Sequence, residues 1–156
     1  MDKQEQVTHT SALWQRLFKS PTVNQYIAAN DAAMNLPKFS DYITDLCRER
    51  GEIPEHVINR ACIERSYGHH LFRGTRNPSR DTVLQIAFGL NLDVEETQQL
   101  LKIAHMTALH PKVKRDAVIA HCLYNHETTM TARLVLHELD LPLLGGICDG
   151  QKKCNR

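Results

Sequence analysis

The sequence contains no apolar run long enough to cross a membrane. A transmembrane helix needs about 18 or more consecutive apolar residues, and polar or charged residues interrupt every apolar stretch of this 156-residue chain well before that length. The first ten residues, MDKQEQVTHT, also lack the apolar centre of a secretory signal peptide. These absences predict a cytoplasmic protein with no membrane partner.

Motifs that indicate an enzyme or a metal site are missing as well. The chain has no H-E-x-x-H zinc motif, no G-x-S-x-G nucleophile motif and no phosphate-binding glycine loop. The adjacent histidines His69 and His70 would diverge by about 100° on a helix, so they are poorly placed to bind one ion together. We therefore expect no catalytic activity, no cofactor and no metal site.

The cysteines give no sign of a disulfide framework. They number five, and no two form a C-x-x-C pair. Cys47, Cys62 and Cys122 lie in apolar helical patterns and are predicted to be small buried hydrophobic residues. Cys148 and Cys154 lie in the tail GGICDGQKKCNR, where a zinc site would need two further ligands, so a flexible terminus is the preferred interpretation.

Alternation of apolar and polar residues, the pattern of a β-strand, is absent over any useful length. The recurring spacing is i, i+1, i+4, i+5, which places apolar side chains along one face of a helix. It occurs at 42–47, 57–62, 83–88 and 118–123. Less regular helical patterns cover 13–18, 23–29, 93–104 and 132–139. The sequence thus predicts an all-α fold of seven to nine helices.

Residues with known positional preferences mark the ends of these helices. Pro54 suits the first turn of a helix, and Ser40 and Ser79 are candidate N-caps. Asp93 and Glu96 have the spacing of a capping box. Gly89 is expected to stop the helix that precedes it.

Positive charge gathers in one segment although the formal net charge is only +1. The segment Arg60–Arg80 contains five arginines and a single acid, Glu64. Within it, the patterns predict a helix from Pro54 to Ala61, a turn from Cys62 to Glu64, and a second helix that ends at Gly74. Two short helices joined so closely cross steeply, as in a DNA-binding helix-turn-helix.

The residues from Ile53 to Leu101 resemble the Xre, or Cro/repressor-type, helix-turn-helix family. A glycine, basic residues, Pro-Ser and an I-A-x-x-L helix carry the resemblance. The matching positions are Gly74, Thr75, Arg76, Pro78, Ser79, Ile86, Ala87 and Leu90. More narrowly, SYGHHLFRGTRNPSRD, LLKIA and ALHPKVKRDAVIA are similar to a group of bacterial Xre-type regulators with extra helices on both sides.

This resemblance implies a lambda-repressor-like, sequence-specific regulator of transcription whose partner is double-stranded DNA. It implies a helix-turn-helix core at 38–105, an N-terminal helical extension at 1–37, a C-terminal helical pair at 106–144 and a tail at 145–156. The residues implied to read bases are Arg65, Ser66, His69 and His70. Those implied to contact phosphate are Arg73, Thr75, Arg76, Ser79 and Arg80.

Departures from the family pattern keep other interpretations open. Pro54 replaces the usual glutamine, Cys62 the usual turn glycine, and Gly68 the usual apolar residue of the second helix. Gly68 permits either the close approach of a neighbouring helix or room for the ring of Tyr67. The alternative function is a protein interaction adaptor, antitoxin-like or encoded by a mobile element, that uses the same fold without specific DNA readout. The basic cluster could also be a solvated, ion-paired face. The group KVKR at 112–115 could extend a DNA or partner contact, but a solvated first helical turn is the preferred interpretation.

A homodimer is the expected assembly, because short helix-turn-helix modules gain affinity and operator spacing by pairing. The leucines of the C-terminal helices are the surface predicted for it: Leu134, Leu136, Leu139, Leu141 and Leu143. Trp14, the single tryptophan, is expected to dock on the domain from a short amphipathic helix.

Overall fold

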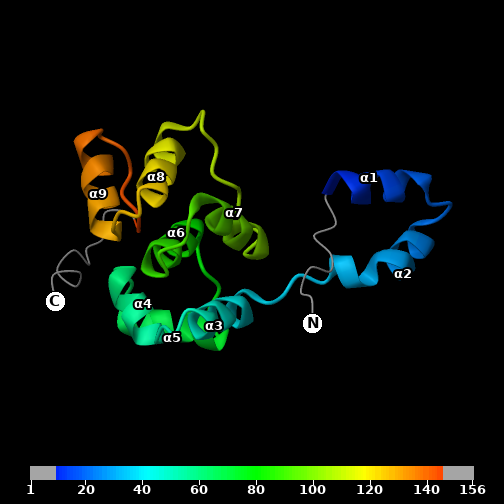
Figure 1. The fold of residues 1–156 in the computed structure, drawn as a ribbon, viewed down its shortest axis with the longest axis horizontal. Helices are drawn as coiled ribbons and strands as arrows, with labels where there is room; N and C mark the ends of the chain where they lie inside the picture. Colours follow the sequence, from blue (N-terminus) through cyan, green and yellow to red (C-terminus); the bar gives the residue numbers. More distant parts are fainter. Residues whose placement is uncertain (1–9, 146–156) are drawn as a thin grey trace. The chain divides into compact units, whose positions relative to one another are not determined.

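The computed structural model describes residues 10–145, and its fold is all-α (Figure 1). The chain divides into two compact units, one ending at Pro37 and the other beginning at Lys38. The described residues form nine helices and no strand. The helices are α1 (Thr10–Lys19), α2 (Val23–Met34), α3 (Phe39–Glu49), α4 (Pro54–Arg60), α5 (Arg65–Arg73), α6 (Arg80–Gly89), α7 (Val94–Ile103), α8 (Lys114–Tyr124) and α9 (Thr129–Glu138).

The all-α expectation is confirmed, and no helix within residues 10–145 combines the length and apolar character that a membrane span requires. Cys148 and Cys154, and all but the first residue of the predicted tail, lie outside the described residues. Several local predictions hold: Pro54 opens α4, Ser79 caps α6, and Asp93 forms a capping box with Glu96. The prediction for Ser40 is wrong, because α3 begins at Phe39 with Lys38 as its N-cap.

The first unit contains a hairpin of α1 and α2. Thr22 caps α2 by accepting a hydrogen bond from the backbone N–H of Gln25 at 3.2 Å. Between the helices, Arg16 Nη1 donates to Asn30 Oδ1 at 3.1 Å, and Asn30 is buried. The hydrogen bond between Arg16 and Asn30 joins the two helices where few apolar side chains are enclosed.

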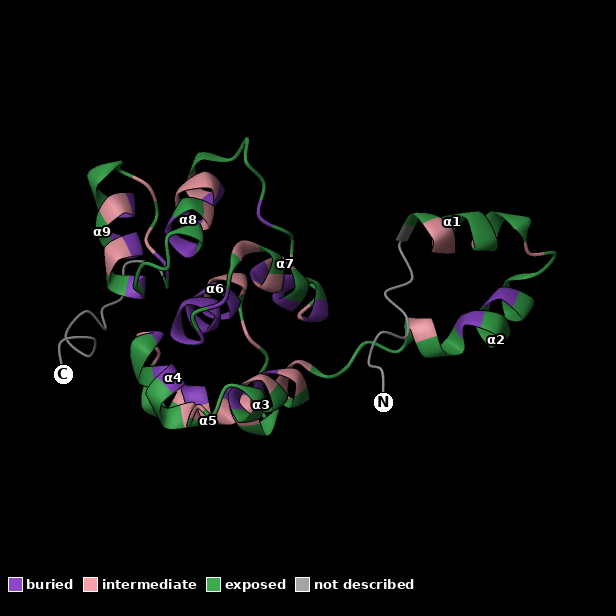
Figure 2. Cartoon of the chain, in the orientation of Figure 1, coloured by how far each residue is buried: buried purple, intermediate pink, exposed green. Residues whose placement is uncertain are grey.

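Helix α6 lies at the centre of the second unit. Every residue from Thr82 to Gly89 is buried, and Figure 2 shows the helix buried over most of its length. It packs against α4, α7 and α9, while α4 also packs against α5. The core gathers side chains from α3 to α9, including Ile43, Leu71 and Leu136. A helix without an exposed side must be apolar nearly all round, which explains the run VLQIAFGL.

Two glycines allow α4 to approach its neighbours closely. A Cβ added to Gly68 of α5 would lie 2.5–2.9 Å from side-chain atoms of Ile58. A Cβ added to Gly89 of α6 would lie 2.5 Å from the backbone oxygen of Val57. Close approach of a helix is therefore the role of Gly68. Helix α6 ends at Gly89, where a stop was expected, and the small size of this residue also allows the contact with α4.

Helices α6 to α9 form two matched helix pairs. Helix α9, Thr129–Glu138, begins and ends 35 residues after α7, Val94–Ile103, and α8 starts within one residue of the same offset from α6. The correspondence extends to residues with left-handed backbone: Asn91 matches His126, and His105 matches Asp140. The sequence pair Arg-Asp opens both pairs, at 80–81 and at 115–116. The structure thus reveals an internal repeat of the helical hairpin.

Candidate nucleic-acid interface

The candidate interface is built on α5, whose exposed face carries the predicted base-reading residues. At about 100° per residue, positions 65, 66, 69, 70 and 73 fall within roughly 140° of the helix circumference. Gly68 and Leu71 lie on the opposite side and are buried against the core. The packing of α5 therefore turns the predicted residues away from the core together.

The first turn of α5 is capped by an acid. One carboxylate oxygen of Glu64 accepts from the backbone N–H of Ser66 at 3.0 Å, and the other accepts from Tyr67 at 2.8 Å. These N–H groups are the donors that a helix N-terminus would offer to a phosphate. In this chain Glu64 occupies them, which fixes the start of α5 and places negative charge there.

Acids also meet the arginines beside the turn. Arg65 Nε lies 3.0 Å from Glu55 Oε1, and Arg60 Nη2 lies 2.9 Å from Glu52 Oε2. The side chain of Arg65 is nevertheless 74% exposed, so its ion pair is open to solvent. Exposed pairs of this kind contribute at most about 1 kcal/mol. Arg65 can therefore exchange Glu55 for another acceptor at small cost.

The predicted histidines and Thr75 have different environments. His69 and His70 are both half-buried. His70 Nδ1 lies 2.7 Å from Thr75 Oγ1, and that hydroxyl also lies within hydrogen-bonding distance, 3.2 Å, of the His70 carbonyl oxygen. These contacts fasten the residue after Gly74 to the last turn of α5. His70 and Thr75 thus shape the end of the helix, while Ser66 and His69 stay on its outer face.

Arg73 and Arg76 are the most available of the predicted phosphate contacts. Both are exposed, and within residues 10–145 neither takes part in an ion pair. Ser79 caps α6, where its Oγ accepts from the Thr82 backbone N–H at 3.2 Å. The loop between Gly74 and Ser79 thus offers uncompensated positive charge beside the first turn of a capped helix.

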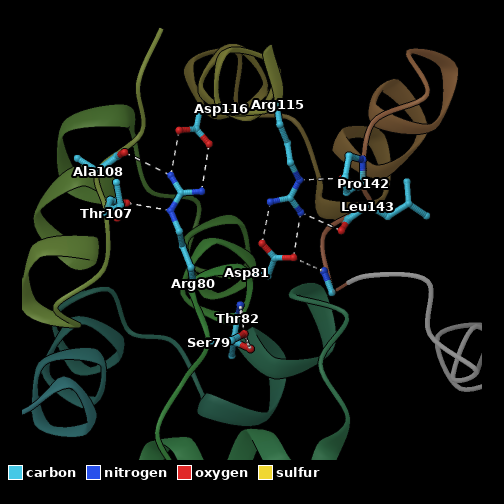
Figure 3. A network of polar contacts seen from close by, with 11 residues as sticks. Ser79, Arg80, Asp81, Thr82, Thr107, Ala108, Arg115, Asp116, Pro142 and Leu143 are labelled. Atoms are coloured by element: carbon cyan, nitrogen blue, oxygen red, sulfur yellow. Dashed lines mark hydrogen bonds and ion pairs between the residues drawn. The ribbon is translucent and has the colours of Figure 1, made fainter. Parts of the chain in front are cut away.

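Arg80, also predicted to contact phosphate, is held by acceptors of the fold itself, unlike Arg73 and Arg76. Its guanidinium forms two hydrogen bonds with the carboxylate of Asp116, at 3.1 and 3.0 Å, and donates to the carbonyl oxygens of Thr107 and Ala108 at 2.9 and 3.3 Å (Figure 3). The Arg80 side chain is 25% exposed and that of Asp116 only 7%. A guanidinium held by this many acceptors is a structural group.

A second ion pair mirrors the first. Arg115 of α8 bonds to both carboxylate oxygens of Asp81 at 2.8 and 2.9 Å, and also donates to the carbonyl oxygens of Pro142 and Leu143 (Figure 3). The Arg-Asp pair that opens α6 and the one that opens α8 thus exchange partners. We call these four residues the reciprocal clamp. It joins α6 to the C-terminal helices, and it holds Arg115 of the basic group at 112–115 in an ion pair.

Gln85, which the sequence patterns did not single out, supports the turn between α4 and α5 from within the core. Gln85 is buried, and its amide Nε2 donates to the carbonyl oxygens of Ala61 and Cys62 at 3.2 and 3.5 Å. Carbonyl groups at a helix C-terminus lack partners within the helix, so the amide satisfies them. The signal in the sequence was a polar residue between Leu84 and Ile86 inside an apolar stripe.

Two of the three cysteines within residues 10–145 lie in the core. Burial, with a smaller effect of the nearby Glu52 charge, raises the pKa of the Cys47 thiol to about 11, so the thiol stays protonated at neutral pH. Cys47 and Cys122 are buried as expected, whereas Cys62 is only half-buried. Within residues 10–145, no group of three His, Cys, Asp or Glu side chains is arranged to hold a metal ion.

Comparisons of this chain with family models, curated proteins and solved structures gave no match. The features that bear on function are therefore those of the site itself: the outward face of α5, the exposed Arg73 and Arg76 at and after its end, and the acids at its start.

Cys62 occupies a backbone conformation that favours glycine, with φ of 57° at the turn between α4 and α5. Replacing it with glycine is expected to stabilise the fold by about 0.5–1 kcal/mol, because the left-handed conformation costs a side-chain-bearing residue more than glycine loses from the unfolded state. Chemical denaturation of both proteins measures the change. Cys62→Ala is the control. An equal gain in stability in that variant would show that loss of the thiol, rather than the backbone conformation, stabilises the protein.

Proposed function

We propose that the protein is a cytoplasmic, sequence-specific double-stranded DNA-binding regulator of transcription of the Xre type. The observation that carries the proposal is the arrangement of α4 and α5. They are joined by a short turn, and Arg65, Ser66 and Arg73 are exposed on one side of α5 together with the half-buried His69. A helix with such a face fits the major groove, where arginine can donate two hydrogen bonds to guanine.

The proposed interface divides into reading and anchoring residues. Arg65, Ser66 and His69 would contact base edges, since they lie in the first turns of α5. Arg73, Arg76 and the helix terminus capped by Ser79 would contact phosphates. His70 and Thr75 would support the end of α5 through their mutual contact. Arg80 is assigned no DNA contact, because the reciprocal clamp holds it.

Selection of bound sequences from random duplexes at two salt concentrations tests the proposal. A sequence-specific reader enriches one motif at both concentrations, and its affinity falls as salt rises because bound phosphates release counterions. A non-specific binder retains DNA at low salt without enriching a motif. Failure to bind any duplex at low salt would refute the proposed function.

Replacing Arg76 with alanine is expected to weaken binding to all duplexes alike and to reduce the salt slope, the change in log K with log salt, by about 1. Replacing Arg65 should instead cost about 1–3 kcal/mol on the preferred sequence and relax the preference at one base pair. Fluorescence anisotropy across a salt series measures both effects. Lys102→Ala, an exposed charge on α7, is the control and should leave the slope unchanged.

The second candidate function, a protein interaction adaptor, is supported by the acids around the turn. Glu64 occupies the first N–H groups of α5, and Glu52 and Glu55 neutralise Arg60 and Arg65. A phosphate approaching this turn would meet three carboxylates. A chain that selects no duplex at either salt concentration, yet binds one protein at a fixed ratio, would favour the adaptor over the DNA reader.

A further inference from the structure

The α1–α2 hairpin leaves most of its apolar side chains uncovered. Within residues 11–37 only Tyr26 and Asn30 are buried. Five large apolar residues of the two helices are exposed instead: Trp14 (54%), Phe18 (78%), Val23 (59%), Ile27 (42%) and Met34 (46%). Soluble proteins rarely leave so many large apolar groups uncovered on one small element without a partner.

These exposed residues share one side of the hairpin. On α1, Trp14 and Phe18 follow the partly buried Leu13 and Leu17 by about 100° around the helix. On α2, Tyr26 marks the buried side. Val23 and Ile27 lie roughly 60–100° around the helix from it, and the rotation has the same sense as on α1. Because the two helices run in opposite directions along the hairpin, equal rotation brings both stripes to the same side.

The aromatic residues give this face a defined centre. The rings of Trp14 and Phe18 are stacked, with centroids 5.6 Å apart and an angle of 21° between their planes. Stacked rings restrict each other's rotamers, so they offer a preformed contact surface. Aromatic side chains of this kind dominate the central contacts of protein interfaces. We call Trp14, Phe18, Val23, Ile27 and Met34 the hairpin face.

The size of the hairpin face matches half of a stable dimer interface. Large apolar side chains expose about 150–250 Å² each when uncovered, so the exposed fractions amount to roughly 500 Å² of apolar surface. A standard interface buries about 800 Å² per partner, and a little over half of that is apolar. A unit of fewer than ~40 residues also needs a partner surface to complete its core.

From this geometry we infer that the hairpin face binds the same face of a second copy of this chain, forming a four-helix interface. The charges of the described helices favour that occupant. Helix α1 carries Lys19 beside Phe18 and no acid, whereas α2 carries Asp31 and no base; Arg16 lies on the other side of α1, where it bonds to Asn30. A two-fold pairing that sets α1 on the partner's α2 therefore brings opposite charges together along both edges.

This assignment moves the dimer away from the C-terminal helices, where the sequence predicted it. Leu136 is fully buried in the core and Leu141 and Leu143 pack against it, so they are not free to bind a partner. Leu134 and Leu139 remain exposed at 60% and 56%. The two surfaces can be distinguished by substitution at matched exposure.

Sedimentation equilibrium of the full chain without nucleic acid tests the inference independently of the proposed function. The wild-type chain is expected to sediment at twice its 17.8 kDa mass at about 100 μM. Phe18→Glu should weaken the dimer at least tenfold, because it places a charge in an apolar centre. Tyr124→Glu, at a position 75% exposed on α8, and Leu134→Glu on α9 are the controls and should leave the dimer intact.

The charges provide a second test that does not disturb the apolar face. Lys19→Glu should weaken the dimer several-fold, and adding Asp31→Lys should restore it, because the double variant exchanges the signs of the two edges. A monomeric wild-type chain, a dimer unaffected by Phe18→Glu, or a dimer lost in Leu134→Glu would each overturn the inference. Circular dichroism of every variant establishes that the helices are retained.

Discussion

Replacing Gly89 with alanine is expected to destabilise the protein by about 3 kcal/mol, although alanine is the better helix former by about 1 kcal/mol. The added Cβ would meet the backbone oxygen of Val57 at 2.5 Å and the Ala61 Cβ at 3.1 Å. A backbone atom cannot rotate away, so α4 must shift as a whole. Its movement would carry the turn and the start of α5 with it. Urea denaturation of both proteins measures the loss.

Gly51→Ala provides the matched control for this change. Gly51 has φ of 64° and no atom within 4 Å of an added Cβ, so alanine there pays only the conformational cost of about 1 kcal/mol. Equal losses in the two variants would show that backbone conformation, rather than the contact with α4, governs both. A gain in stability at Gly89 would contradict the packing of α4 described above.

Replacing Asp116 with alanine is expected to cost about 3 kcal/mol, because it leaves the largely buried Arg80 without its carboxylate partner. Asp116 is 5% exposed, bonds to Arg80 through both oxygens, and also accepts from the backbone N–H of His110 at 3.0 Å. Loss of this half of the reciprocal clamp should loosen the C-terminal helices first. Hydrogen exchange of α8 and α9, together with the free energy of unfolding, measures the effect.

Asp45→Ala controls for the loss of a carboxylate and an ion pair. Asp45 pairs with Arg48 at 3.1 Å on the surface of α3, with both side chains more than half exposed, so its removal should cost no more than about 0.5 kcal/mol. Comparable losses in the two variants would mean that the reciprocal clamp contributes nothing beyond an ordinary surface pair. A duplex affinity lowered by Arg80→Ala without any loss of stability would return Arg80 to the DNA interface.

Local features of the fold were predictable because their determinants lie within a few residues of one another. Ser79 caps α6 through an N–H three residues ahead, and Asp93 and Glu96 bond across one helical turn. Gly74 ends α5 with φ of 79°, a conformation that glycine adopts readily. The spacing of apolar residues likewise indicates which side of each helix is buried, because the side that packs on the core must be apolar.

Features that depend on distant partners were not predictable in this way. Arg80 belongs to a basic segment by sequence, yet its acceptors on Asp116 lie 36 positions away. Cys62 was expected to be buried, but the left-handed turn leaves it half-buried. A charge pattern identifies which residues can form an ion pair, whereas the packing of helices decides which pair meets.

The sequence by itself determined the helices, most of their ends, and the set of residues turned outward on α5, because these follow from short-range hydrogen bonds and from periodicity. The tertiary structure alone decided which arginines remain available: Arg73 and Arg76 stay exposed, while Arg80 and Arg115 are held by aspartates of the opposite helix pair. The physical reason is that a guanidinium binds whichever carboxylate the fold brings within reach, and the fold is set by burial of apolar surface.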